Sequence, residues 1–264
     1  MSLEKNLMIV YENYIIYRDK CYINSKGEKV ELGDIVDKSI DNTEVILDSK
    51  ELWDKLSNYC SKRNKKYIVR ENIENIGVID CIVKLRKDGI KGNIIALNFA
   101  SATNPGGGYL NGSTAQEESI CRGSLLYESI SLQKDFYKYN VDNYTPLYND
   151  NMIYTPDMAV IRNDKNELLD NYEIVSFITS PAVNKNCSRN VLIKDDIINE
   201  AMDRRIKKIL ELAVSKKPSA IVLGAYGCGV FGNDREFVYD TFEKYINELV
   251  PDRIKVYFAV YDRK

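Results

Sequence analysis

The chain has 264 residues, of which 44% are hydrophobic and 29% are charged, and its formal net charge is −2. This length and apolar content suffice for one sizeable folded domain, and the balanced charge gives no bulk preference for nucleic acid or a membrane surface. The sequence contains no histidine, which excludes Ser–His and Cys–His nucleophilic dyads and His-ligated zinc. General acid–base chemistry must therefore come from Asp, Glu, Lys, Tyr or Cys side chains.

The cysteines and the absence of long apolar runs indicate the compartment. Six cysteines are scattered along the chain without a close pair, which is typical of reduced thiols and argues against a four-cysteine metal site. No apolar run reaches the length of a membrane span, and the first residues lack a secretory pattern. We therefore expect a cytoplasmic protein with no membrane partner.

Apolar periodicity predicts helices that alternate with strands. Residues 3–17 are expected to form a helix and residues 21–32 a hairpin, and Asp48 is expected to cap a helix that extends to Cys60. Most later strands are nearly continuous apolar runs, as expected when helices cover both faces of a sheet. This order favours βαβ units and a mostly parallel sheet. Further strands are predicted at 66–70, 93–99, 160–162, 174–179, 220–223 and 254–260, with helices near 79–85, 197–214 and 234–249.

The chain shows no internal repeat or linker, which predicts a single domain. Its core is expected to span residues 71–264, with residues 1–70 as a helical and hairpin extension packed on that core. Residues 139–151 are rich in Asn, Asp and Tyr and are predicted to form a long surface loop. The basic residues from Arg204 to Lys208 lie along an amphipathic helix, where we expect a solvated face and not a nucleic-acid site.

A run of three glycines, Gly106–Gly108, follows a predicted strand, and a spacer of seven residues separates it from Gln116–Glu118. Glycines reach positive φ and present amide N–H groups without side chains, a geometry that suits an anion such as a pyrophosphate. Two adjacent carboxyl groups beside such an anion can do acid–base work. Thr114 and Glu117 also match a capping box, which would give Glu117 a structural role at a helix N-terminus. That motif does not require Glu118, which we therefore take as the stronger catalytic candidate.

A second glycine-rich loop, Gly224–Asp234, follows the predicted strand 220–223. A strand, a glycine loop and a helix N-terminus in succession form a geometry that binds phosphate. Asn233 and Glu236 have the spacing of an N-cap and its third helical residue. Phe231, an aromatic residue among glycines, either stacks on a base or ribose or anchors the loop to the core.

The same loop offers an alternative function. Gly227, Gly229 and Gly232 satisfy the G-x-G-x-x-G pattern of dinucleotide-binding proteins. That fingerprint normally opens its domain, whereas only one predicted strand follows it here. The pattern therefore argues weakly for a nicotinamide-dependent oxidoreductase.

Together these motifs resemble those of the bacterial-type poly(ADP-ribose) glycohydrolases, a branch of the macrodomain superfamily. The resemblance spans almost the whole chain, and it implies a macrodomain-like three-layer α/β/α fold with a central mixed, mostly parallel sheet that binds ADP-ribose. One departure is Tyr226, where the family commonly has tryptophan, and we expect this change to affect packing behind the loop but not the chemistry. The matching segments are Leu97–Ala102, Pro105–Gly108, Gln116–Ser119, Thr179–Ala182, Leu223–Asn233 and Tyr257–Val260.

The resemblance also implies roles for individual residues. Glu118 would be the catalytic glutamate, and Glu117 its neighbour that contacts the distal ribose. Phe231 would press on that ribose, the two glycine loops would hold the diphosphate, and Asn98 or Asn104 would bind ribose hydroxyls. The thiol of Cys228 is expected to be a packing group. The full implied ligand-binding set is Gly106, Gly107, Gly108, Gln116, Asn98, Asn104, Gly227, Cys228, Gly229, Val230 and Phe231.

The predicted activity is cleavage of the ribose–ribose O-glycosidic bond of poly(ADP-ribose), with release of ADP-ribose and without a metal or cofactor. The predicted partner is ADP-ribose or its polymer on modified proteins, with modified nucleic acid as a further acceptor, and the protein is expected to be a monomer. Two alternatives use the same pocket: a non-catalytic ADP-ribose reader and a hydrolase of a mono-ADP-ribosylated acceptor. The oxidoreductase is the third alternative.

Overall fold

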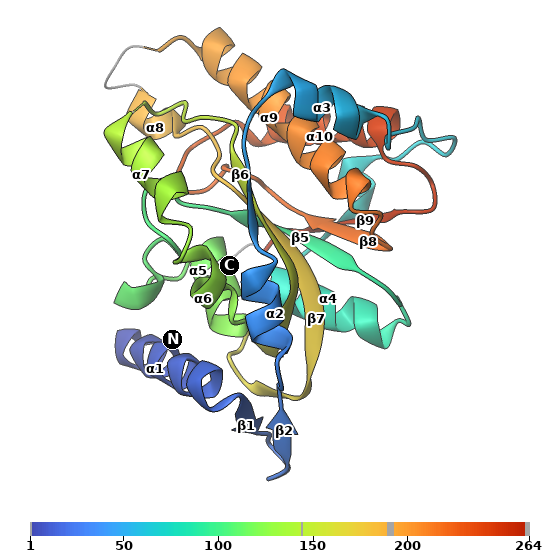
Figure 1. Ribbon diagram of the computed structural model, residues 1–264. Helices are drawn as coiled ribbons and strands as arrows, with labels where there is room; N and C mark the ends of the chain where they lie inside the picture. The colour runs from blue at the N-terminus through green and yellow to red at the C-terminus, as the bar shows by residue number, and fades with distance from the viewer. Residues whose placement is uncertain (1, 144, 189–192, 262–264) are drawn as a thin grey trace.

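A seven-stranded sheet forms the centre of the computed structural model, which describes residues 2–143, 145–188 and 193–261 (Figure 1). Its strands are β3 (Glu44–Ile46), β4 (Ile73–Glu74), β5 (Ile94–Phe99), β6 (Met152–Arg162), β7 (Leu168–Ser180), β8 (Ala220–Leu223) and β9 (Lys255–Ala259). They lie in the order β3-β6-β7-β5-β8-β9-β4. The strand β6 is antiparallel to β3 and β7, while β7, β5, β8, β9 and β4 run parallel to one another.

Helices cover both faces of this sheet. Successive residues of a strand point to opposite faces, and in β5 the buried Ile95 and Leu97 belong to one apolar cluster while Ile94 and Ala96 belong to the other. The predicted three-layer fold with a mixed, mostly parallel sheet is confirmed. The helices are α1 (Leu3–Asp19), α2 (Ile35–Asp41), α3 (Lys50–Ser57), α4 (Val78–Lys87), α5 (Gln116–Gly123), α6 (Leu126–Ile130), α7 (Lys134–Asp142), α8 (Lys185–Ser188), α9 (Asp195–Ser215), α10 (Arg235–Leu249) and the short 3-10 turns η1 (Val69–Asn72) and η2 (Tyr109–Asn111).

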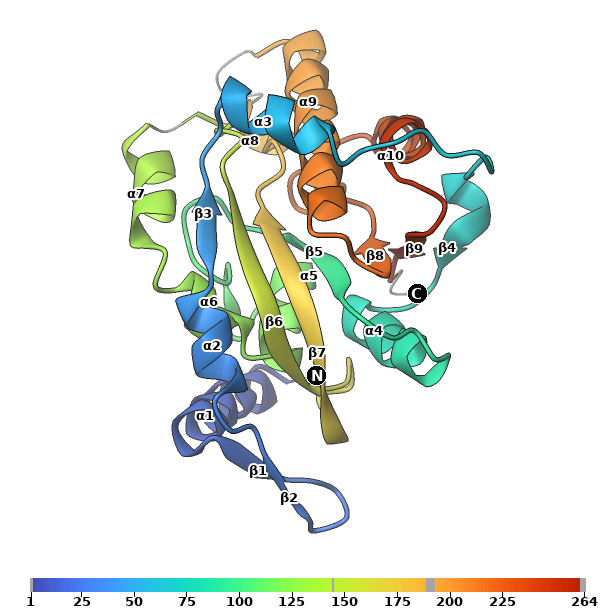
Figure 2. The same ribbon diagram turned by 45° about the vertical axis from the view of Figure 1, so that its right-hand side comes forward.

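The N-terminal segment forms the predicted helix and hairpin. The helix α1 begins after Ser2, whose side chain accepts a hydrogen bond from the Lys5 amide, and the hairpin pairs β1 (Cys21–Ile23) with β2 (Lys29–Glu31). Figure 2 shows α1 and this hairpin together at one end of the molecule, with α3, α9 and α10 at the other. Because β3 pairs with β6, the first 70 residues also contribute a strand to the main sheet. The boundary at residue 70 stays a prediction.

The strand predicted at 66–70 is wrong. The Tyr67 amide donates to Asn247 Oδ1 at 2.8 Å, and the Val69 amide donates to Glu243 Oε2 at 3.0 Å. Both acceptors are side chains of α10, so these amides are not available to a sheet ladder, and the chain forms the 3-10 turn η1 instead.

The helix cap predicted at Asp48 is also wrong. Ser49 is the N-cap of α3, and its hydroxyl accepts a hydrogen bond from the Leu52 amide at 3.3 Å. Asp48 instead accepts hydrogen bonds from Trp53 Nε1 and from Lys208 Nζ, each at 2.6 Å. Both residues can accept from a helix N-terminus, and the side-chain partners that Asp48 has in Trp53 and Lys208 leave the cap to Ser49.

The hairpin of β6 and β7 is longer than the two short strands predicted for it. A register shift between Thr155 and Met158, with Asp157 at a φ of 47°, interrupts the apolar pattern in the middle of β6. Such a bulge adds a residue to one strand while the pairing continues on both sides of it. The predicted loop at 139–151 is likewise partly helical, because α7 extends to Asp142.

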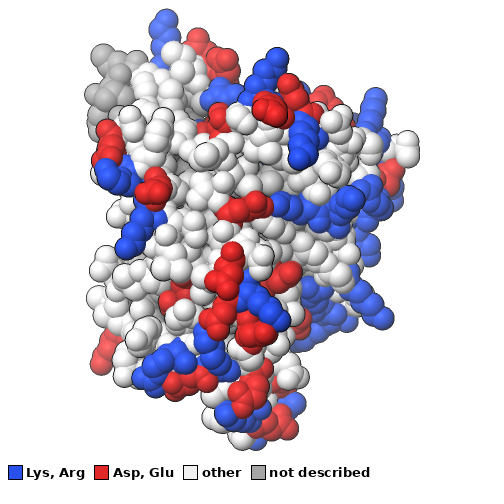
Figure 3. All heavy atoms as spheres, viewed as in Figure 1, with Lys and Arg blue, Asp and Glu red and all other residues white. Residues whose placement is uncertain are grey.

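Charged side chains of both signs are interspersed over the face drawn in Figure 3. This distribution agrees with the net charge of −2. Within residues 2–143, 145–188 and 193–261, no helix combines the length and the apolar character that a membrane span requires. The same residues contain no cluster of three or more His, Cys, Asp or Glu side chains that could hold a metal ion.

Candidate active site

The two glycine loops leave the sheet side by side. The strands β5 and β8 are parallel neighbours, with Ile94 opposite Ala220 and Ala96 opposite Val222. The loops that follow Phe99 and Leu223 therefore start at the same edge of the sheet. The carboxyl ends of parallel strands are where open α/β sheets bind their ligands.

The first loop folds back onto the carboxyl groups of α5. Gly106 and Gly107 have φ values of 68° and 59°, which glycine reaches without strain. A Cβ at Gly107 would lie 2.6 Å from Glu118 Oε1 and 3.1 Å from Glu117 Oε2. The Gly108 amide donates to Glu118 Oε1 at 2.8 Å. The spacing between the glycines and the glutamates thus encodes a direct contact between them.

Glu117 does not form the predicted capping box. The N-cap of α5 is Ala115, with no side-chain hydrogen bond, and the Glu117 carboxyl group points back to the end of β5. Its Oε2 accepts from the Ser101 amide at 2.7 Å and its Oε1 from Asn98 Nδ2 at 3.2 Å. Glu117 is buried, and this burial raises its pKa to about 8, with hydrogen bonds from Ser101 and Asn98 opposing the rise.

Gln116 fastens the start of α5 to the end of β5. Its Nε2 donates to the Leu97 carbonyl and its Oε1 accepts from the Phe99 amide, both at 2.8 Å. The side-chain amide is thus engaged as donor and as acceptor. The predicted contact of Gln116 with a ligand stays a prediction.

Two buried oxygen atoms in this site have no hydrogen-bond partner among the described residues. They are Oε2 of Glu118, whose residue is 7% exposed, and Oδ1 of Asn98, whose residue is fully buried. Asn98 Nδ2, in contrast, donates to both Glu117 and Thr179. A buried acceptor without a partner costs about 1–3 kcal/mol, so such atoms indicate a place where a ligand or water completes the site. Asn104, the other candidate, is exposed.

A cavity of about 920 Å³ opens at this edge of the sheet. This volume lies in the range of sites for nucleotide-sized ligands. Its lining includes four of the predicted site residues, namely Gln116, Cys228, Gly229 and Val230. The lining does not include Glu117, Glu118 or Phe231, nor any glycine of the first loop. Lining residues that sequence motifs did not indicate are Asn6, Asp80, Arg122, Asp164 and Arg235.

One part of the cavity wall is a pair of aspartates that no motif predicts. The Asp80 amide donates to Asp164 Oδ2 at 2.8 Å, and the Asp164 amide donates to Asp80 Oδ1 at 3.0 Å. Asp164, from the turn between β6 and β7, thereby caps α4, whose N-cap residue Gly77 has no side chain. Burial raises the pKa of Asp164 to about 6. The partners are 84 residues apart, so no local pattern could have indicated the pair.

The second glycine loop is held tightly against its surroundings. A Cβ at Gly224 would lie 2.5 Å from the Ala259 carbonyl oxygen, and Gly227 has a φ of 72°. Asn233 is not the helix cap that its spacing predicts, because its Nδ2 donates to Val183 O at 2.7 Å and to Gly227 O at 3.1 Å. The N-cap of α10 is the next residue, Asp234. Asn233 therefore closes the loop on itself.

Cys228, Phe231 and Tyr226 are three further residues of this loop, and they differ in burial and in contacts. Burial raises the pKa of Cys228 to about 12, so its thiol is neutral near pH 7, in line with a packing role. Phe231 is half-buried, with its ring centroid 6.4 Å from that of Tyr148. Tyr226 is fully buried, its ring contacts Phe99 edge-on at 5.6 Å, and its hydroxyl lies 3.1 Å from Ser180 Oγ.

The fold and the site together define a macrodomain-like α/β enzyme, with two buried carboxyl groups against the first glycine loop and a nucleotide-sized cavity at the same edge of the sheet. Residues 12–163 match the family model for the microbial-type PARG catalytic domain, in which PARG denotes poly(ADP-ribose) glycohydrolase. The chain belongs to this family. It is therefore a glycohydrolase, and the predicted family and activity are confirmed.

Solved structures of bacterial poly(ADP-ribose) glycohydrolases are similar over most of the chain. The enzyme from Thermomonospora curvata bound to the inhibitor ADP-HPD is 31% identical, with a TM-score of 0.87 over 98% of this chain and 94% of that one. The enzyme from Deinococcus radiodurans in complex with ADP-ribose is 30% identical, with a TM-score of 0.77 over 86% of this chain and 91% of that one. No curated protein matches the chain significantly.

Proposed function

We propose that this glycohydrolase holds an ADP-ribose unit of poly(ADP-ribose) between its two glycine loops and that Glu118 is the general acid and base. The observation that carries this assignment is the Glu118 carboxyl group itself. Its Oε1 is fixed by the Gly108 amide, while its buried Oε2 has no partner among the described residues. The first oxygen thus orients the group, and the second is available to the substrate.

The chemistry follows from the charge that develops in the reaction. Cleavage of a ribose–ribose bond builds positive charge on the anomeric carbon in an oxocarbenium-like transition state. Glu118 donates its proton to the departing ribose oxygen as the bond from carbon to oxygen breaks. A water then adds to the same carbon and returns a proton to Glu118. Acid–base assistance of this kind contributes about 10²–10⁴ in rate.

The other predicted residues orient the substrate in this scheme. Glu117, held by the Ser101 amide and by Asn98, would accept hydrogen bonds from the distal ribose. The glycine loops would present amide N–H groups to the diphosphate, whose negative charge offsets the charge of the transition state. Phe231 would contact the distal ribose.

Proton transfer by Glu118 suffices for both steps of the scheme, so we propose a metal-independent reaction. We further propose that the protein acts as a cytoplasmic monomer on polymer attached to modified proteins. The scattered cysteines support the cytoplasmic part of this proposal.

The test is to incubate the protein with labelled poly(ADP-ribose) and, separately, with mono-ADP-ribosylated protein and nucleic acid, each with and without EDTA. The proposal expects ADP-ribose from the polymer at a rate that EDTA does not change. Turnover of a mono-modified substrate alone would assign a different acceptor. A rate that EDTA abolishes and a divalent metal restores would contradict metal independence.

A further inference from the structure

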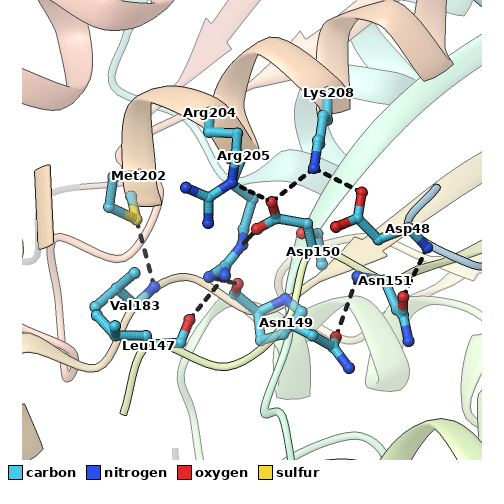
Figure 4. Close-up of polar contacts among 12 residues, drawn as sticks. Asp48, Leu147, Asn149, Asp150, Asn151, Val183, Met202, Arg204, Arg205 and Lys208 are labelled. Atoms are coloured by element: carbon cyan, nitrogen blue, oxygen red, sulfur yellow. Dashed lines mark hydrogen bonds and ion pairs between the residues drawn. The ribbon is translucent and has the colours of Figure 1, made fainter. Parts of the chain in front are cut away.

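Arg205 of α9 and Asp150, which lies just before β6, form a buried ion pair (Figure 4). Arg205 is 0% exposed and Asp150 2% exposed, and Arg205 Nε donates to Asp150 Oδ1 at 3.0 Å. Arg204 Nε and Lys208 Nζ donate to the other carboxylate oxygen at 2.6 and 2.8 Å. Burial opposes ionisation of Asp150, but these cations outweigh it and lower its pKa to about 2. The solvated basic face predicted for this helix is therefore wrong for Arg205.

Arg205 also joins two loop segments to α9. Its Nη1 donates to the Pro181 carbonyl at 2.9 Å and its Nη2 to the Leu147 carbonyl at 2.7 Å. One segment (residues 145–151) precedes β6 and the other (residues 181–184) follows β7. Because β6 and β7 are antiparallel, both segments lie at the edge of the sheet from which the glycine loops leave.

The segment 181–184 contacts the start and the end of the second glycine loop. The Val183 carbonyl accepts from Asn233 Nδ2 at 2.7 Å. A Cβ at Gly227 would lie 2.5 Å from Ala182 Cβ, so the two backbones approach as closely as glycine permits. A shift of this segment would therefore move the loop with it.

Phe231 is supported from both segments. The Tyr148 ring of the segment 145–151 lies 6.4 Å from the Phe231 ring, between centroids. Asn186, on α8 directly after the segment 181–184, donates from its amide to Phe231 O at 3.1 Å and from Nδ2 to Val230 O at 2.8 Å. The side chain of Phe231 thus contacts one of the segments that Arg205 holds, and its main chain contacts the helix that directly follows the other.

We propose that Arg205 and Asp150 are positioning residues that hold Phe231 in the orientation required for turnover. This inference rests on the proposed function, in which Phe231 contacts the distal ribose. The two carbonyl contacts satisfy donors of the buried guanidinium group, and they also connect it to the segments that contact the second glycine loop. The guanidinium group therefore contacts the segments that contact the loop carrying Phe231, and its effect on Phe231 is indirect.

The test is a double-mutant cycle of Arg205→Lys and Phe231→Ala, with the kinetics measured at a temperature where circular dichroism shows each variant folded. Lysine keeps the charge opposite Asp150 but loses the planar group that reaches Leu147 and Pro181. We expect kcat to fall about tenfold or more with KM within about threefold, since displacements near 1 Å cost up to about 10² in rate. In the Phe231→Ala background, Arg205→Lys should cost nothing further.

The matched control is Lys207→Met on the same helix. Lys207 pairs with the buried Glu211 at 3.6 Å, so this variant also removes an ion pair with a buried carboxylate. It should leave kcat unchanged. If Arg205→Lys does not fold, Tyr148→Leu replaces it in the cycle, because Tyr148 is only partly buried, with the same expected loss and the same non-additivity.

Two results would overturn the inference: a folded Arg205→Lys variant with wild-type kcat, or an equal loss of kcat with and without the Phe231 side chain. Either result leaves the proposed function intact, provided that the wild-type protein releases ADP-ribose from the polymer. A wild-type protein without this turnover would contradict the proposed function itself, and the role of Arg205 with it.

Discussion

Gly107 and Glu118 approach each other so closely that a methyl group on Gly107 would lie 2.6 Å from Glu118 Oε1. Gly107 also has a φ of 59°, a conformation that costs other residues about 1–2 kcal/mol. Two independent constraints therefore require glycine here, one from the backbone and one from the neighbouring carboxyl group. The first glycine loop therefore fits closely around the carboxyl group of Glu118.

The Gly107→Ala variant should lose at least about 10² in kcat, because the added methyl displaces the carboxyl group of Glu118. Gly27→Ala is the matched control. Gly27 has a φ of 80°, but a Cβ there meets nothing within 4 Å. Both variants should lose about 1–2 kcal/mol of stability through the positive φ, with a larger loss for Gly107→Ala because of its clash, and only Gly107→Ala should lose turnover. Equal activity of the two variants would show that the contact with Glu118 does not matter for catalysis.

The buried Glu117 carboxyl group should make stability depend on pH. Its pKa rises from 4.5 to about 8 in the folded protein, so the native state keeps a proton that the unfolded state releases. The free energy of unfolding should therefore fall as the pH rises from about 4.5 through about 8. Urea unfolding across this range should show a flatter decline for Glu117→Gln than for wild type. Parallel declines would mean that Glu117 does not hold the proton.

Substitutions of Phe231 should separate its two possible roles. Leucine fills most of the volume of the ring and can anchor the loop to the core, but it offers no aromatic face to a ribose. If Phe231 contacts the substrate, Phe231→Leu and Phe231→Ala should both lose about tenfold or more in kcat. If it only anchors the loop, leucine should restore wild-type kinetics, which would remove Phe231 from the site.

Sequence patterns predicted the parts of the fold that local residues determine. The strands β5 and β8 are continuous apolar runs, and the spacing from Gly106–Gly108 to Glu118 reports a real contact. Several of the wrong predictions share one cause: a partner outside the local segment claims a group that local rules assign elsewhere. The Glu117 carboxyl group accepts hydrogen bonds from Ser101 and Asn98 and does not form a capping box. Arg205 is buried and paired with Asp150, which lies 55 residues away in the sequence.

The sequence also does not indicate which of two neighbouring residues caps a helix. Asn233 and Asp234 are both good N-caps, and the Val183 carbonyl, which binds Asn233, leaves the cap to Asp234. Asp164 caps α4 from a hairpin turn, a role that no spacing within α4 indicates. The aspartate pair in the cavity wall could therefore be found only from the folded chain.

The central claim, that Glu118 transfers the proton, is tested most directly by Glu118→Gln, which keeps the shape of the side chain and removes its acid. The measurement is kcat on poly(ADP-ribose) together with ADP-ribose affinity by calorimetry, beside wild type and the exposed control Glu248→Gln. We predict that Glu118→Gln loses at least about 10² in kcat while its affinity stays within a few-fold and the control matches wild type. A Glu118→Gln variant that hydrolyses the polymer as fast as wild type would contradict the account.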